Sequence, residues 1–154
     1  PSVRICEAQN GQGSWSDDGT IAFTSAGNLF LVPAGGGTPA RLGPSDLRGT
    51  HPHWVPGNKT VLITRRRSAL PGASSIEAVN RTTGATTTII DGENARLAPT
   101  GELLFTRDDD VWAAAFDAGR LAVRGEPVVV LEALRNPINQ AALFAVAADG
   151  TGKR

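Results

Sequence analysis

Short apolar runs recur along the chain, and each one directly follows a tight polar turn. The runs are Ile21–Phe23, Val61–Ile63 and Leu103–Phe105, and the turn pairs before them are Asp18-Gly19, Gly57-Asn58 and Thr100-Gly101. Gly, Asn and Asp tolerate the positive φ that tight hairpin turns require. Runs that are apolar at almost every position are typical of strands covered on both faces. The pattern therefore predicts an all-β chain whose hairpins carry buried middle strands.

The same hairpin pattern repeats along the chain at similar intervals. An aromatic or large apolar residue precedes each turn, at Trp15, Trp54 and Leu97, and a weaker copy begins at Val146. A period of roughly 40–45 residues with several strands in each unit is the repeat of a β-propeller blade. The sequence thus predicts three four-stranded blades and the start of a fourth, in a single domain over 1–154. The expected blades span about 13–42, 51–91, 95–131 and, incompletely, 140–154.

Some strand boundaries depend on local signals within these blades. The inner strand of the third blade is expected at Arg96–Ala98, and its outer strand at Pro127–Leu131. Val3–Cys6 is expected to form a short strand ahead of the first blade. The run Ala34–Gly37 is interpreted as a turn and not as a phosphate-binding loop, because neither a helix pattern nor a Lys-Ser/Thr pair follows it.

The residues of these repeats resemble a known family. Trp15-Ser16-Asp17-Asp18-Gly19 and the stretch Pro52–Asn58 resemble the core motif of TolB-like, WD-type propellers. The segments Ser14–Phe23 and Leu29–Leu42, and later Phe116–Leu134, are similar to the propeller that follows the kinase domain and membrane helix of bacterial serine/threonine kinases. The resemblance implies a scaffold of about six blades and an extracytoplasmic or periplasmic location. Because propellers host unrelated activities, it says little about function.

Composition narrows the classes of partner. Fifteen basic and fifteen acidic residues give a formal net charge of zero, so no basic surplus exists for binding nucleic acid. Cys6 is the single cysteine, so no internal disulfide can form. No apolar run reaches the roughly 18 residues of a membrane span, so no membrane insertion by this segment is expected. The chain begins with Pro1, and we therefore interpret it as an excised or processed piece.

One rim of the expected propeller is the candidate binding site. Its connections, at 43–50, 66–73, 107–109 and 132–139, are longer and more charged than the Gly-rich turns of the opposite rim. Variable loops on a rigid scaffold are where binding usually sits. The candidate contacts are Arg48, His51, Arg65, Arg66, Arg67, Glu93, Arg107, Asp108 and Asn136. A solvated rim without a ligand is the alternative interpretation.

Three clusters of histidine, aspartate or arginine residues could bind a metal ion or an anion. His51 and His53 lie two residues apart, which on a regular strand places both side chains on one face, but the sequence offers no further histidine as a ligand. The run Asp108–Asp110 lacks the alternating spacing of a calcium loop and is interpreted as a solvated hairpin. The run Arg65–Arg67 is interpreted as part of a surface loop, with anion binding as the alternative. No metal and no cofactor are expected.

Catalytic motifs are absent from the sequence. It contains no G-x-S-x-G elbow, no His-Glu-x-x-His pair and no Cys-His arrangement that can be argued. The leading hypothesis is a non-catalytic binding or sensor module for a protein, peptide or small ligand. The alternatives are a propeller fragment of a hydrolase and a self-assembling structural module. Because open blade edges invite association, dimerisation that completes a six-bladed ring is a further hypothesis.

Overall fold

The computed structural model describes residues 4–132, 145–146 and 152–153. Blade 1 consists of β1 (Gly13–Trp15), β2 (Thr20–Ser25), β3 (Asn28–Pro33) and β4 (Ala40–Arg41). Blade 2 consists of β5 (Thr50–Trp54), β6 (Thr60–Arg66), β7 (Ser74–Asn80) and β8 (Thr86–Asp91). Blade 3 consists of β9 (Glu93–Leu97), β10 (Glu102–Arg107), β11 (Asp110–Asp117) and β12 (Ala122–Leu131). Within these described ranges, no helix has the length and apolar character needed to cross a lipid bilayer.

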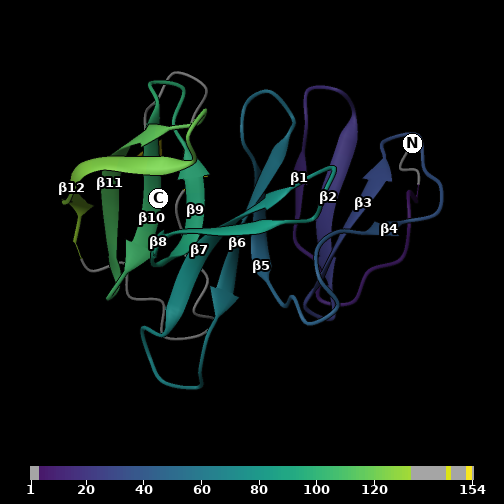
Figure 1. Cartoon of the computed structure of the whole chain (residues 1–154), viewed down its shortest axis with the longest axis horizontal. Coiled ribbons are helices and arrows are strands. Elements are labelled where there is room, and N and C mark those ends of the chain that lie inside the picture. Colours follow the sequence, from purple (N-terminus) through teal and green to yellow (C-terminus); the bar gives the residue numbers. More distant parts are fainter. Residues whose placement is uncertain (1–3, 133–144, 147–151, 154) are drawn as a thin grey trace.

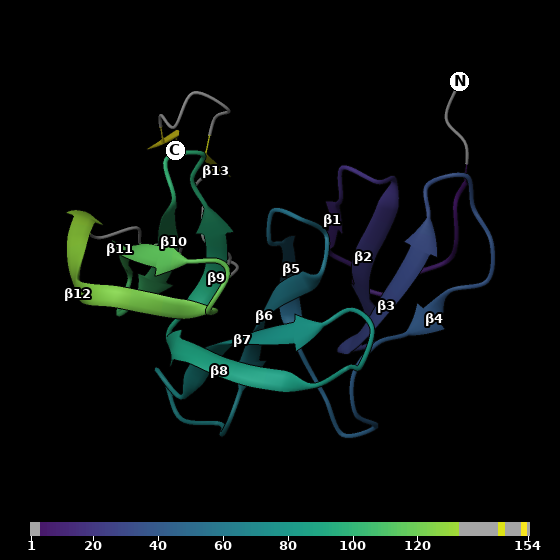
Figure 2. The ribbon, with the colours of Figure 1, turned by 45° about the horizontal axis from the view of Figure 1, so that its top comes forward.

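Each blade is an antiparallel sheet whose strands lie in chain order. The three sheets follow one another across the molecule, with blade 2 between blades 1 and 3 (Figures 1 and 2). The first strands touch in succession, β1 with β5 and β5 with β9. This arrangement confirms the expected all-β fold of three four-stranded propeller blades.

The fourth blade is described only in part. Strands β13 (Ala145–Val146) and β14 (Gly152–Lys153) pair antiparallel. The other residues of the expected fourth blade, and residues 132–139 apart from Glu132, lie outside the described residues.

Three strand boundaries differ from expectation. Residues 4–6 are not in a strand, although Val3–Cys6 was expected to form one; Val3 itself lies outside the described residues. Strand β9 begins three residues early, at Glu93. Strand β12 starts at Ala122, because Gly125 adopts a positive φ of 69° and the register shifts between Ala113 and Ala115 on the paired strand. Such bulges let a strand continue past a break in its pairing.

The hydrophobic core lies between the blades. One buried cluster joins blades 1 and 2, with Ala22 and Leu29 packed against Trp54 and Val61. A second buried cluster joins blades 2 and 3; its members include Leu62, Ile76, Leu103 and Phe105. Both faces of the middle sheet are therefore buried, which explains why β6 is apolar from Val61 to Ile63 without alternation.

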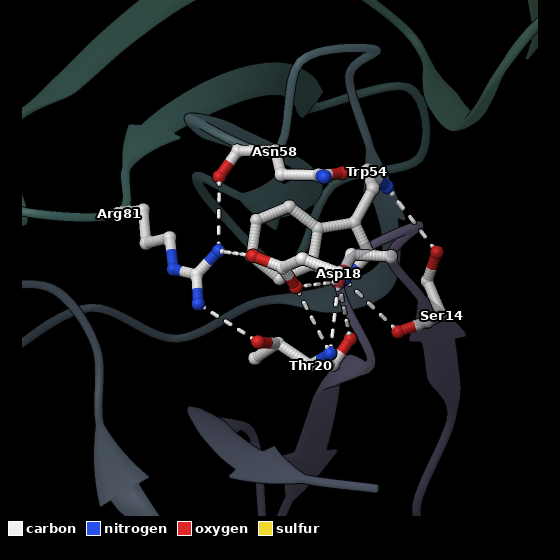
Figure 3. Close-up of polar contacts among 7 residues, drawn as sticks. Ser14, Asp18, Thr20, Trp54, Asn58 and Arg81 are labelled. Carbon is white, nitrogen blue, oxygen red and sulfur yellow. Dashed lines mark hydrogen bonds and ion pairs between the residues drawn. The ribbon is translucent and has the colours of Figure 1, made fainter.

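Trp54 is the centre of the first junction, and only 6% of its surface is exposed. Its indole N–H donates to the Ser14 carbonyl oxygen of blade 1 at 3.1 Å, and its backbone N–H donates to Ser14 Oγ at 3.2 Å (Figure 3). The Arg81 guanidinium lies over the ring at 5.4 Å and reaches back to Asp18 Oδ2 at 2.5 Å. The contacts with Arg81, Ser16 and Thr20 hold the pKa of Asp18 well below its ordinary value, the bond from Ser16 being the largest cause.

Candidate functional site

A cleft opens at the rim that carries the longer connections. It encloses about 360 Å³ and draws residues from all three blades. Four of the predicted rim residues line it, namely Arg48, His51, Arg66 and Glu93. The loop before β5 supplies Arg48, the second position of β5 supplies His51, the end of β6 supplies Arg66 and the start of β9 supplies Glu93.

Four further polar residues line the cleft and were not among the predicted contacts: Gln12, Thr50, Thr64 and Ser74. Gln12 precedes β1, while Thr64 and Ser74 lie within β6 and at the start of β7. A signal for Gln12 exists in the repeat, because it lies three residues before Trp15 as His51 lies three residues before Trp54. Aligning the copies on their Trp position would have brought both residues to the same rim.

His51 has an unusual backbone. Its φ is +52°, a left-handed conformation that a non-glycine residue seldom adopts, and the β5–β6 register shifts between Thr50 and His53. The backbone N–H of His51 donates to Gln12 Oε1 of blade 1 at 2.7 Å. Its Nδ1 lies 3.0 Å from Thr50 Oγ1. Its Nε2 is buried and has no hydrogen-bond partner among the described residues.

The same left-handed conformation, with a backbone bond to the preceding blade, recurs in blade 3 at Asn94. Its φ is +53°, and its backbone N–H donates to Thr64 Oγ1 of blade 2 at 2.8 Å. Its side-chain Oδ1 is also buried without a hydrogen-bond partner in the described part of the chain. Asn94 lies three residues before Leu97, as His51 lies three residues before Trp54. A left-handed residue bonded to the preceding blade is therefore a repeated feature of the inner strands at this rim.

The charges of the cleft are two guanidinium groups and one carboxylate. Nη1 of Arg48 donates to the carbonyl oxygens of Ser45 and Leu47, each at 3.0 Å, which fixes the side chain. The Arg66 guanidinium has no hydrogen bond or ion pair within the described residues. The Glu93 carboxylate accepts a bond from Ser74 Oγ at 2.6 Å. The cleft thus offers one unpaired cation beside a fixed one.

Burial lowers the pKa of His51, and the nearby Arg96 charge acts in the same direction while Glu93 opposes it. His51 is therefore neutral near pH 7. A neutral imidazole presents one donor and one acceptor. Here Nδ1 lies against Thr50 Oγ1, and Nε2 has no hydrogen-bond partner among the described residues.

His53 does not share the cleft with His51, because the bulge at His51 breaks the alternation that sequence spacing implies. Its Nε2 accepts the backbone N–H of Leu97 at 3.1 Å. Burial, helped by the Arg96 charge, lowers the pKa of His53 to about 4. Among the described residues no group of three or more His, Cys, Asp or Glu side chains is placed to hold a metal ion. His53 thus joins two blades, and its bonded Nε2 is not available as a ligand atom.

The other predicted rim residues make structural contacts outside the cleft. Arg65 lies in β6 and pairs with Glu77 Oε2 at 3.4 Å and with Asp46 Oδ2 at 3.6 Å. Arg67 pairs with the Asp91 carboxylate. Arg65 and Arg66 are thus strand residues, and only Arg67 belongs to the surface loop predicted for the arginine run.

Arg107 and Asp108 lie at the β10–β11 hairpin. Arg107 donates to the Asp91 carbonyl oxygen at 2.6 and 3.1 Å, and its guanidinium covers the rings of Phe105 and Trp112 at 5.2 and 5.3 Å. Asp108 occupies the hairpin turn, where its φ is +52°. Asn136 lies outside the described residues.

Comparison with solved structures shows the same architecture. The chain superposes on a protein described as a TolB from Agrobacterium tumefaciens with a TM-score of 0.61 and 16% identity, covering 81% of this chain and 50% of that one. The fold is a TolB-like β-propeller. TolB from Acinetobacter baumannii gives a TM-score of 0.55 with 14% identity, covering 79% of this chain and 35% of that chain. No family model and no curated protein matches the sequence.

A calcium-binding protein, regucalcin from Agrobacterium tumefaciens, is also similar, with a TM-score of 0.54 and 23% identity over 76% of this chain and 43% of that one. The chain therefore spans half or less of the length of these structures. At such identities the likeness establishes the propeller fold, and the same fold carries several functions.

Proposed function

We propose that this propeller segment is a non-catalytic binding module whose rim cleft takes up a carboxylate-bearing ligand, such as a single acidic side chain of a protein or peptide partner. The observation that carries the proposal is the cleft of about 360 Å³ with the Arg66 guanidinium unpaired among the described residues. Arginine suits this role because its planar fork matches a carboxylate.

The walls of the cleft support recognition better than catalysis. Arg48 is fixed by two backbone carbonyl oxygens, so a ligand meets it already oriented. The strained backbone at His51 is held by its bond to Gln12, and strain that a surrounding structure maintains often marks functional positions. Glu93 is engaged by Ser74 and would repel a second negative charge. The cleft would therefore select a ligand with a single carboxylate.

The sequence resemblance to kinase-linked propellers fits a sensor role for such a cleft. In that setting the segment would lie outside the cytoplasm, and ligand capture at the rim would be its contribution to signalling. A TolB-like interaction role in the periplasm would use the same cleft. Both readings share the binding chemistry, which can be measured on the segment itself.

Calorimetric titration of the full chain tests the proposal. The probe is an acetylated and amidated peptide of glycine, glutamate and glycine, and the matched peptide carries glutamine in place of glutamate. We expect one binding event for the glutamate peptide, weakened by added salt, and a much weaker one for the glutamine peptide. Because a hydrogen bond to a charged group contributes about 1.5–3 kcal/mol, Arg66→Gln should weaken binding by tenfold or more.

Arg120→Gln is the matched control. Arg120 is exposed on the β11–β12 connection, away from the cleft, and its substitution should leave the affinity unchanged. Equal affinity for the two peptides, equal effects of the two arginine substitutions, or no binding at millimolar peptide would overturn the proposal.

A further inference from the structure

Two charges of opposite sign lie in the rim cleft without a partner of their own. Within the described residues, Arg66 makes no side-chain hydrogen bond or ion pair, and the Glu93 carboxylate has no cationic partner. Both residues line the same cleft of about 360 Å³, but they do not pair with each other. A cation and an anion held apart in one cleft are together complementary to a ligand that carries both charges.

Ser74 links the positions of the two charges. It lies directly opposite Arg66 in the β6–β7 pair, and its hydroxyl donates to Glu93 Oε1 at 2.6 Å. Cβ atoms of directly opposite residues in antiparallel strands are about 4.5–5.5 Å apart. The bond from Ser74 occupies one carboxylate oxygen of Glu93, while Oε2 accepts no hydrogen bond within the described residues. Glu93 therefore keeps an acceptor for a ligand within a short distance of the Arg66 strand.

The charges of the cleft follow the order of the blades. Arg48 lies on the blade 1 side: a Cβ built on Gly27, in the β2–β3 turn, would be 3.3 Å from Arg48 Cδ, and the Gly49 N–H donates to the Gly27 carbonyl oxygen at 2.8 Å. Glu93 is the first residue of β9 in blade 3. Arg66 ends β6 in blade 2, which lies between the other two blades (Figures 1 and 2). The cleft thus has a cationic end towards blade 1 and an acidic end towards blade 3.

We propose, as a refinement that rests on the proposed function, that the partner segment presents a lysine side chain beside its acidic one, with the carboxylate at Arg66 and the ammonium at Glu93. The charge of Glu93 repels a second carboxylate and attracts a cation, so one residue sets both preferences. Side chains two residues apart on an extended peptide lie on one face, about 6.5 Å apart along the chain. A cleft of about 360 Å³ is of the size that encloses a small ligand, and such a pair of side chains fits that size.

Calorimetric titration of the full chain with matched peptides tests the pairing. The probe is acetylated and amidated glutamate-glycine-lysine, and the matched peptide carries glutamine in place of lysine. Both are also made in the reverse order, since either chain direction places the two side chains on one face. We expect lysine to raise the affinity about fivefold in one of the two orders, as for an ion pair at a partly exposed site. Added salt should reduce this advantage.

Glu93→Gln tests the residue assigned to the cation. Its amide oxygen can still accept the Ser74 hydroxyl, so the local contact is retained while the charge is lost. This variant should bind the lysine and glutamine peptides with equal affinity. Glu126→Gln is the matched control, because Glu126 is exposed on β12 and does not line the cleft. It should keep the full advantage of the lysine peptide, and circular dichroism confirms that both variants remain folded.

The outcomes separate this inference from the proposed function. Equal affinities of the lysine and glutamine peptides in both orders would refute the charge pair while leaving the carboxylate site intact. A lysine advantage that persists in Glu93→Gln, or that is lost equally in Glu126→Gln, would also refute it, because the cation would then bind elsewhere. If no glutamate peptide binds at millimolar concentration, the proposed function fails, and the charge pair fails with it.

Discussion

Replacing Trp54 should damage the protein far more than replacing Trp15, although the two residues occupy the same position of the repeat. Trp54 is 6% exposed and joins blades 1 and 2, whereas Trp15 is 62% exposed. Trp54→Ala, Trp54→Phe and Trp15→Ala form the series. The first removes the ring, the second keeps an aromatic ring but loses the indole N–H, and the third removes a ring that covers no described blade.

The magnitude follows from the contacts. Truncating a buried aromatic to alanine costs about 3–5 kcal/mol. Loss of the indole bond to the Ser14 carbonyl contributes about 1 kcal/mol, and loss of the ring under Arg81 contributes about 0.5–1 kcal/mol. These terms overlap, so we expect about 4 kcal/mol for Trp54→Ala and about 1–2 kcal/mol for Trp54→Phe. Trp15→Ala should cost less than about 1 kcal/mol, as for a mainly exposed side chain.

Urea denaturation followed by circular dichroism measures these values. With a urea dependence of about 2 kcal/mol per molar, Trp54→Ala should lower the midpoint by about 2 M. Similar midpoint shifts for Trp54→Ala and Trp15→Ala would refute the reasoning, because it assigns the whole difference to the blade 1–blade 2 junction.

Two further predictions concern polar contacts at the junctions. Because the pKa of His53 falls from its ordinary 6.5 to about 4 on folding, the unfolded chain binds more protons between these values, and stability should fall by up to about 3 kcal/mol as pH drops from about 6.5 to about 4. The lowered pKa of His51 changes stability with pH in the same direction. In His53→Gln the amide oxygen can still accept the Leu97 N–H, but the side chain no longer titrates. Urea titrations at several pH values should therefore show that this variant loses most of the pH dependence of stability. Arg81→Ala should cost about 1–2 kcal/mol, and a double-mutant cycle with Asp18→Asn should show coupling, whereas additive effects would contradict the bridge between blades.

The strand plan could be predicted from the sequence because turn chemistry and apolar runs act locally. Asp18-Gly19 and the apolar run after it predict strands at Ser14–Ser16 and Thr20–Thr24, and β1 and β2 lie within one residue of these bounds. The extension of β12 to Ala122 could not be predicted, since it depends on a bulge at Gly125 and on pairing with β11. Whether a strand continues past a bulge is decided by its partner and not by its own residues.

The sequence predicted which rim carries the candidate site, but not which of its residues line the cleft. Loop length and charge placed Arg48, His51, Arg66 and Glu93 on one rim, and the structure brings these four together. The same signals also selected Arg65, which instead forms ion pairs with Glu77 and Asp46. Sequence spacing cannot tell a free guanidinium from a paired one, because the partners come from a neighbouring strand and from the connection before β5.

The left-handed conformation of His51 also could not be predicted from sequence spacing. His-Pro-His in β5 predicts two side chains on one face, but the positive φ of His51 separates them. A backbone bond to Gln12, contributed by a different blade, holds this conformation. In the sequence, the left-handed conformation is indicated only by the alignment of the repeats, in which His51 and Asn94 occupy the same position.

Amide hydrogen exchange at Trp54 and Leu97 tests the central claim most directly, because both amides lie on edge strands and find their acceptors only in the neighbouring blade. Nuclear magnetic resonance should show both amides exchanging about a hundredfold or more slower than in an unstructured peptide, and Ser14→Ala should accelerate exchange at Trp54 while leaving Leu97 unchanged. Exchange of both amides at the unprotected rate in the folded chain would contradict the blade-to-blade docking on which the fold and the cleft depend.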